Sequence, residues 1–285
     1  MKILVTGVKG QLGYDLCRIL SDRQIEHKGV DIEDFDITDK SAVFSYIEGY
    51  RPDAIIHCSA FTAVDRAEDE VELCTRVNAD GPANIAAAAA SIGAKMMYIS
   101  TDYVFPGTGE AFYRPEDETG ALSVYGKTKR MGEEAVIAAS DRHFIVRISW
   151  VFGINGNNFI KTMLRLSETK TDLNVVCDQI GSPTYTYDLS KLLCDMIVTD
   201  KYGIYHATNE GVCSWAEFAE EIMKQGGKST KIHPIPTSEY PTRASRPLNS
   251  RMSKDKLEEA GFARLPHWKD ALTRYLAELN DSSRQ

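Results

Sequence analysis

The stretch KILVTGVKGQLG, residues 2–13, decides the fold of this 285-residue chain. An apolar run ends at Gly7, and Gly10 and Gly13 follow where a helix is predicted to begin. Gly7 allows a tight turn, Gly10 lets the backbone approach a pyrophosphate, and Gly13 lets the helix pack closely on a sheet. The helix N-terminus adds free N–H groups and a partial positive charge that favour phosphate. The stretch therefore predicts a dinucleotide site, and glycines that serve packing alone are the alternative.

A carboxylate follows this turn at the spacing expected for an adenosine ribose. Asp31 ends a second short strand, predicted over 26–31. An acid there can bind the ribose hydroxyls, and its charge repels a 2′-phosphate, so we expect NADH to be accepted. Asp36 and Ile37 are candidates for the adenine edge, and residues 58–62, CSAFT, for the sugar and phosphates.

Strands and helices alternate through the first half of the chain. The predicted strands are 2–7, 26–31, 53–60, 95–101 and 143–149, with helices over 11–23, 78–94 and around 123–129. Short apolar strands separated by helices indicate a parallel, doubly wound α/β sheet of the Rossmann type.

The pattern changes after Trp150. We expect helices over 157–168, 187–198, 253–260 and 267–279, and a helix opened by a Ser214–Glu217 capping box. We also expect a strand that runs into a loop over 173–184, a strand over 203–209, and an irregular proline-rich segment over 233–247. This predicts a dinucleotide-binding domain over 1–152, to which segments near 178–208 return. A smaller C-terminal substrate-binding α/β lobe occupies most of 153–285.

Composition excludes several classes of protein. The net charge of −8 argues against nucleic-acid binding, and no apolar run is long enough for a membrane helix. The start of the chain does not read as a signal peptide, and the six cysteines lack CxxC spacing, so we expect a cytoplasmic protein with free thiols. The six histidines form no metal-binding cluster, so no metal is expected.

The segment SVYGKTK, residues 123–129, places Tyr125 and Lys129 on one helix face. A packed tyrosine beside a surface lysine is the alternative, but the hydroxyl-rich YISTDYVF, residues 98–105, ends the preceding strand, where ligands bind in such sheets. Proton donation near neutrality requires lowering the tyrosine pKa by about three units, or ~4 kcal/mol. A lysine ammonium ~5 Å away supplies about 3 kcal/mol at an effective dielectric constant of ~20. We therefore expect Tyr125 to be an acid assisted by Lys129, and Thr101 to donate a hydrogen bond to a substrate carbonyl.

Together with 51–70, 148–166, 178–186 and 246–258, these motifs resemble the extended short-chain dehydrogenase/reductase family over nearly the whole chain. More specifically, they are similar to the branch that reduces the C4 keto group of dTDP-6-deoxy-L-lyxo-4-hexulose, with NADPH or NADH, to dTDP-L-rhamnose.

The resemblance implies a role for each site residue. Tyr125 is the proton donor, Lys129 its partner, and Thr101 the carbonyl contact. The implied cofactor residues are Gly7, Gly10, Gln11, Leu12, Gly13, Asp31, Asp36, Ile37, Ala60, Phe61, Thr62, Tyr125 and Lys129. The implied substrate residues are Thr101, Asp102, Trp150, Asn158 and Arg246, with Trp150 as a wall of the sugar site and the last two as candidates for the diphosphate.

Some enzymes of this family bind magnesium through glutamates at a dimer contact. The corresponding positions here are Asp15 and Tyr187, and because tyrosine is a poor magnesium ligand we predict no magnesium requirement. A homodimer is left open. Two alternatives also stay open: a non-catalytic regulatory subunit like that of methionine adenosyltransferase, and a reductase or epimerase of another nucleotide sugar.

Overall fold

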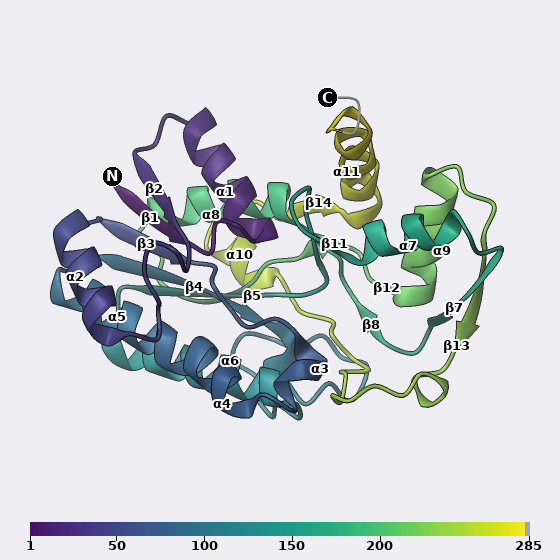
Figure 1. Ribbon diagram of the computed structural model, residues 1–285, viewed down its shortest axis with the longest axis horizontal. Helices are drawn as coiled ribbons and strands as arrows, with labels where there is room; N and C mark the ends of the chain where they lie inside the picture. The colour runs from purple at the N-terminus through teal and green to yellow at the C-terminus, as the bar shows by residue number, and fades with distance from the viewer. Residues whose placement is uncertain (283–285) are drawn as a thin grey trace.

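Figure 1 shows the computed structural model, which describes residues 1–282. Within that range the main sheet has six strands in the order β10-β5-β4-β3-β1-β2, and all neighbouring pairs are parallel. They are β1 Ile3–Thr6, β2 His27–Val30, β3 Ala54–His57, β4 Lys95–Thr101, β5 His143–Ile148 and β10 Gly203–His206. The chain proceeds from β1 to β2 in one direction and from β3 onward in the other. A crevice for ligands is expected at this reversal, beyond the carboxyl ends of the strands.

Helices cover both faces of this sheet, so the predicted doubly wound α/β fold is confirmed (Figure 1). α1 Gln11–Asp22 and α8 Thr186–Ile197 share one core with it, and α2 Lys40–Tyr50, α5 Gly81–Ser91 and α6 Val124–Ala139 share the other. Strand residues such as Ile3, Leu4 and Val5 are fully buried, because the two faces take alternate side chains. In residues 1–282, none of the helices has the length and apolar character needed to cross a membrane.

α2 was not among the predicted helices, although its start carries a clear signal. The Asp39 carboxylate accepts hydrogen bonds from the N–H groups of Ser41 and Ala42, which is an N-cap. The helix ends at Arg51, whose backbone is left-handed with φ 50°.

The predicted helix over 78–94 is two elements. After α3 Val64–Ala67 and α4 Val71–Thr75 the chain makes a π-helical turn, η1 Arg76–Asp80, and α5 follows. A π-turn holds one extra residue and so changes the direction of its side chains, often at functional sites. α6 is preceded by a 3₁₀ turn, η2 Asp102–Val104.

The rest of the chain forms a small lobe beyond β5, at the right of Figure 1. Its core includes Phe152, Phe218 and Trp268. Its elements are β6 Val151–Phe152, α7 Phe159–Ser167, β7 Asp172–Val176, β8 Ile180–Gly181, β9 Thr184–Tyr185, β11 Asn209–Glu210, β12 Cys213–Ser214, α9 Trp215–Gln225, β13 Lys231–Ile235, η3 Thr237–Glu239, β14 Leu265–His267 and α11 Trp268–Ser282. The short helix α10 Asp255–Glu259 instead packs against β10 of the main sheet, where its Leu257 joins the core that contains α1 and α8. The Ser214–Glu217 capping box is confirmed, with both of its hydrogen bonds present.

The prediction of an irregular segment over 233–247 is wrong at its start. Residues 231–235 pair in parallel with β7 as the two-stranded sheet β13-β7. Pro234 has no N–H to donate, but a strand with one free edge tolerates proline there.

α8 and β10 follow small-lobe elements in the sequence, yet β10 is a strand of the main sheet and α8 packs against that sheet. α8 packs beside α1, and β10 pairs with β5. Of the segments near 178–208, α8 and β10 lie with the large sheet, whereas β8 and β9 pair with small-lobe strands. The division into a domain over 1–152 and a lobe over most of 153–285 stays a prediction.

Candidate active site

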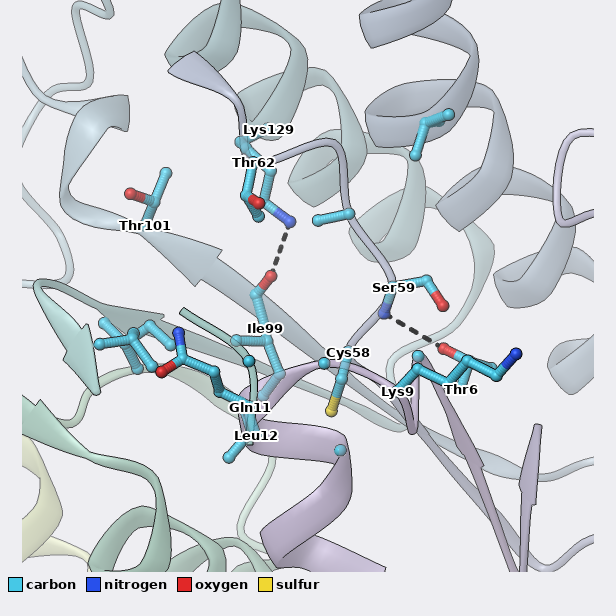
Figure 2. Close-up of a pocket in the computed structure, with 18 of the residues that line it drawn as sticks. Thr6, Lys9, Gln11, Leu12, Cys58, Ser59, Thr62, Ile99, Thr101 and Lys129 are labelled. Atoms are coloured by element: carbon cyan, nitrogen blue, oxygen red, sulfur yellow. Dashed lines mark hydrogen bonds between the residues drawn. The ribbon is translucent and has the colours of Figure 1, made fainter. Parts of the chain in front are cut away.

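A cavity of about 780 Å³ lies beyond the carboxyl ends of the strands of the main sheet. Part of its wall is shown in Figure 2. Of the predicted residues, those that line it are Gly7, Gly10, Gln11, Leu12, Gly13, Asp31, Asp36, Ile37, Ala60, Thr62, Thr101, Asp102, Tyr125, Lys129 and Trp150. One cavity thus brings together the glycine-rich turn and the tyrosine–lysine pair.

The glycine-rich turn is too tight for other residues. Gly7 has φ 72°, and a Cβ atom on it would lie 2.7 Å from the backbone nitrogen of Ser59. A Cβ atom on Gly13 would lie 2.3 Å from the carbonyl oxygen of Gly7. α1 starts at Gln11, and its N-cap, Gly10, has no side chain to cap the first-turn N–H groups. These groups are therefore available to phosphate oxygens.

Two acidic side chains that follow β2, Asp31 and Glu33, contact Lys9 of the glycine-rich turn. The Asp31 carboxylate accepts hydrogen bonds from the N–H groups of Lys9 and Ile32, each at 2.9 Å. These bonds fix the carboxylate at the cavity wall. The Lys9 ammonium, which also lines the cavity, is paired with Glu33.

The segment that carries Ala60 and Thr62 is held by the π-turn. The Asn78 side chain accepts from the Phe61 N–H at 2.8 Å and donates to the Phe61 carbonyl at 3.1 Å. In the described part of the chain, Phe61 is not among the cavity-lining residues, although its two neighbours are. Asn78 thereby sets the position of Ala60 and Thr62.

Lys129 is almost completely buried, with 2% of its surface exposed. Its Nζ donates to the carbonyl oxygen of Ile99 at 2.7 Å (Figure 2) and lies 4.0 Å from the centre of the Tyr98 ring. Burial lowers the pKa of Lys129 to about 7, against the opposing effect of the Glu133 carboxylate one turn along α6.

Tyr125 does not have the lowered pKa that its distance from Lys129 predicts. Burial raises the pKa of Tyr125 well above its usual value, and the hydrogen bond with Thr101 opposes the shift only in part. Charge on Asp102 and Tyr103 raises the pKa further. The expectation assumed a charged lysine, but a lysine with a pKa near 7 is neutral at the pH where a phenol titrates.

Thr101 does not direct its proton into the cavity. Its hydroxyl donates to Oδ1 of Asp102 at 2.9 Å, so the predicted bond to a substrate carbonyl requires the hydroxyl to turn. Asp102 also accepts from Ser250, and burial raises the pKa of this carboxyl to about 6.

Trp150 lines the cavity where the small lobe begins. Its backbone is left-handed, with φ 50°, and its indole stacks on that of Trp215 with the ring centres 3.8 Å apart. No sequence signal marked either feature.

Two predicted diphosphate residues lie beside the cavity and are not among its lining residues in the described part of the chain. Asn158 caps α7 and donates to Gln11, Gly153 and Tyr275. Arg246 is paired with Asp65 at 2.6 Å, and it contacts the Tyr103 hydroxyl at 3.4 Å. Asn158 thus contacts Gln11 at the start of α1, whereas Arg246 is held by Asp65, and both assignments to the substrate diphosphate stay predictions.

The positions weighed for magnesium lie outside this cavity. Asp15 is buried and accepts from Thr186 and from Arg18. Tyr187 has the Lys191 ammonium 4.1 Å from its ring centre. Among residues 1–282 there is no cluster of three acidic, histidine or cysteine side chains that could hold a metal ion.

Sequence reasoning missed several residues of the cavity wall. Missed lining residues include Lys9, Phe35, Val64, Val77, Ser149, Val151, Gly156 and Asn157, whereas Cys58 and Ser59 belong to the predicted segment 58–62. Two of the missed residues could have been found from the sequence. Lys9 precedes Gly10 in the predicted turn, and Ser149 ends the predicted strand over 143–149, where ligands bind in such sheets. Gly156 and Asn157 reach the wall through the fold of the loop before α7.

Comparisons with known proteins agree with this geometry. The RmlD substrate binding domain family matches residues 1–281. A dTDP-4-dehydrorhamnose reductase from Sinorhizobium fredii is 40% identical over 285 residues, covering 96% of this chain and 96% of that protein. This chain belongs to the dTDP-4-dehydrorhamnose reductase family.

Two further proteins are similar to this chain over nearly its whole length. Spore coat polysaccharide biosynthesis protein SpsK of Bacillus subtilis is 43% identical over 277 residues, covering 97% of both chains. The crystal structure of dTDP-4-dehydrorhamnose reductase from Bacillus anthracis, in complex with NADP, superposes with a TM-score of 0.95. It is 40% identical and covers 97% of this chain and 99% of that one. The family expected from the sequence motifs is confirmed.

Proposed function

We propose that this chain reduces the C4 keto group of dTDP-6-deoxy-L-lyxo-4-hexulose, giving dTDP-L-rhamnose, with NADPH or NADH as hydride donor. The observation that carries the proposal is that Tyr125, Lys129 and Thr101 share one cavity wall with the glycine-rich turn. Relatives that cover the whole chain are dTDP-4-dehydrorhamnose reductases, and one is in complex with NADP. Because these reductases match over nearly the whole chain, the enzyme is favoured over the regulatory-subunit alternative.

The residues around the turn fit a nicotinamide dinucleotide. Gly10 and the first turn of α1 would hold the diphosphate, Asp31 the adenosine ribose, and Asp36 and Ile37 the adenine side. Lys129 would hold the hydroxyls of the nicotinamide ribose. When bound, the reduced nicotinamide supplies a hydride to the carbonyl carbon of the substrate.

Tyr125 would give its hydroxyl proton to the C4 oxygen as that oxygen gains negative charge. In its charged form, the Lys129 ammonium would stabilise the phenolate left on Tyr125. Thr101 can assist by turning its hydroxyl from Asp102 toward Tyr125 or the substrate. We infer that the sugar lies against Asp102 and Trp150, which both line the cavity.

We also infer a cytoplasmic enzyme without a nucleic-acid partner, because the net charge is −8 and the substrate is a nucleotide sugar. The prediction of no magnesium requirement is supported by Tyr187 standing where a carboxylate would be needed. A rate that falls with EDTA and returns with magnesium would contradict it.

Replacing Tyr125 with phenylalanine tests the proposal. The wild type should consume NADPH or NADH when given the dTDP-keto sugar, measured by the loss of cofactor absorbance. Tyr125→Phe should lower kcat at least about 100-fold, because a positioned acid contributes that much, while cofactor binding stays nearly unchanged.

Tyr103→Phe is the matched control. Tyr103 packs edge-on against Tyr125 with ring centres 5.4 Å apart, but its hydroxyl contacts Arg246. It should keep kcat within a few-fold. A normal rate for Tyr125→Phe would refute the assignment. Epimerised sugar without net cofactor consumption would instead favour the epimerase alternative.

A further inference from the structure

Trp150 is held in a conformation that its own backbone disfavours. A non-glycine residue at φ 50° costs on the order of 1–3 kcal/mol and persists only where its surroundings impose it. The surroundings here are specific. The Trp150 carbonyl accepts from the Thr184 N–H at 3.1 Å, and the Thr184 hydroxyl donates to the Ser149 carbonyl at 2.6 Å. The backbone is therefore fixed on both sides of the indole.

The Trp150 indole is also held by two small-lobe residues, Gly181 in a strand pair and Trp215 directly after that pair. A Cβ atom on Gly181 would lie 2.8 Å from Cε2 of Trp150, so only glycine allows the ring to lie so close. Trp215 stacks on the ring with the two planes 15° apart. Gly181 pairs with Cys213 in the antiparallel β8–β12 ladder, and Trp215 comes two residues after Cys213. One ladder thus brings both contacts to Trp150.

Trp215 itself belongs to the small lobe. It is the first residue of α9, directly after the capping residue Ser214, and its ring packs against Phe159 and Phe218. Within the described chain Trp215 is not among the residues that line the cavity, whereas Trp150 is. The contact of Trp215 with the cavity wall is therefore its stacking on Trp150.

We propose that Trp215 is a positioning residue that fixes the Trp150 indole at the sugar end of the cavity. The inference rests on the proposed function, because it takes Trp150 to be the wall met by the nucleotide-linked keto sugar. Through this stacked pair the small lobe sets the shape of the sugar site while the large sheet holds the cofactor. Loss of the pair should weaken binding of the sugar substrate and leave the cofactor site intact.

Steady-state kinetics of Trp215→Leu and Trp215→Phe provide the first test. In Trp215→Leu the KM for the keto sugar should rise about tenfold, which corresponds to losing an aromatic pair, with the KM for NADPH unchanged. Trp215→Phe keeps a ring at this place and should recover part of the loss. Trp268→Phe is the matched control, because Trp268 packs edge-on against Phe218 in the small-lobe core. It should leave both KM values unchanged.

Circular dichroism provides a readout independent of activity. The chain has three tryptophans, so a signal from the stacked indoles can be assigned. Trp150→Phe and Trp215→Phe should each remove the same exciton couplet, and Trp268→Phe should retain it. Adding the dTDP-linked keto sugar should alter the exciton couplet of the wild type.

An unchanged sugar KM in Trp215→Leu overturns the proposal, as does an equal rise in the KM values for sugar and NADPH. A couplet that survives in Trp215→Phe overturns it as well. If the wild type does not oxidise NADPH with this sugar, the proposed function fails separately. The couplet and its response to dTDP alone then still decide whether Trp215 positions Trp150.

Discussion

Tyr125 and Lys129 lie one turn apart on α6, and burial moves their pKa values in opposite directions. Both shifts favour the uncharged forms. The sequence could predict that the two side chains are neighbours, because the spacing of four is local. It could not predict that the Ile99 carbonyl and the Tyr98 ring would enclose the Lys129 ammonium, since both belong to a different strand.

The lowered pKa of Lys129 makes the stability of the protein depend on pH. The folded-state pKa is about 7 and the ordinary value is 10.5, so between these the unfolded chain binds more protons. The free energy of unfolding therefore rises with pH through that window, and the destabilisation is complete below about pH 7. Lys129→Met lacks this group. The free energy of unfolding of each protein can be measured with urea. The value for the wild type minus the value for Lys129→Met should rise between about pH 7 and about pH 9.

Lys127→Met is the control for this experiment, because Lys127 is exposed on the same helix. Its difference from the wild type should stay flat with pH. A flat difference for Lys129→Met would show that Lys129 is fully charged in the folded protein. Lys129→Met should also weaken cofactor binding and slow turnover.

The π-turn η1 was not predicted from the sequence, although its Asn78 positions the cavity-lining residues Ala60 and Thr62. The alanine-rich composition predicted one helix over 78–94, and composition does not reveal the extra residue in the π-turn Arg76–Asp80. α2 was overlooked although Asp39 is a good N-cap, and β13 was taken for a loop because of its proline. The main-sheet strands were predicted well, since short apolar runs between helices leave few alternatives.

Asn78→Asp tests the role of the π-turn. Aspartate keeps the size of the side chain but cannot donate to the Phe61 carbonyl, and its charge repels that oxygen. Loss of a buried hydrogen bond costs roughly 1–3 kcal/mol, and part of it should appear at the cofactor site. We expect the KM for NADPH to rise about tenfold, with a smaller change in kcat.

Asn209→Asp is a matched control in the small lobe. The Asn209 side chain accepts from the Tyr185 N–H at 2.7 Å and donates to the Pro266 carbonyl at 2.9 Å, much as Asn78 does with Phe61. It should lower the free energy of unfolding without changing the KM for NADPH. If the two variants have the same kinetics, Asn78 supports only overall stability.

At the scale of the whole molecule, hydrogen bonds between distant segments connect the large sheet to the small lobe around the cavity. Gln11 accepts from the Gly153 N–H, Ser250 donates to Asp102, and Arg246 pairs with Asp65. Sequence reasoning predicted the sheet, the lobe and most of the wall, because those follow from local patterns. These long-range contacts join segments more than a hundred residues apart, and no local pattern contains them.

Nucleotide selectivity can be tested on the whole protein by thermal unfolding. A ligand that binds only the native state stabilises it by about 2.7 kcal/mol at a concentration of 100 times its Kd. With NADPH present, dTDP should raise Tm more than UDP or GDP at equal concentration. Inorganic pyrophosphate is the control for diphosphate contacts alone. Equal shifts for the three nucleotides would contradict selection of the thymine base.

The placement of β10 has a consequence for how the chain is made. The outermost strand of the large sheet and the covering helix α8 are both encoded after β6–β9 and α7. When only the first 152 residues have left the ribosome, β5 has an unpaired edge because β10 is absent, and α1 lacks its packing partner α8. A fragment that ends at residue 152 should therefore aggregate and be poorly soluble. A fragment that continues past His206 contains β10, which pairs with the exposed edge of β5.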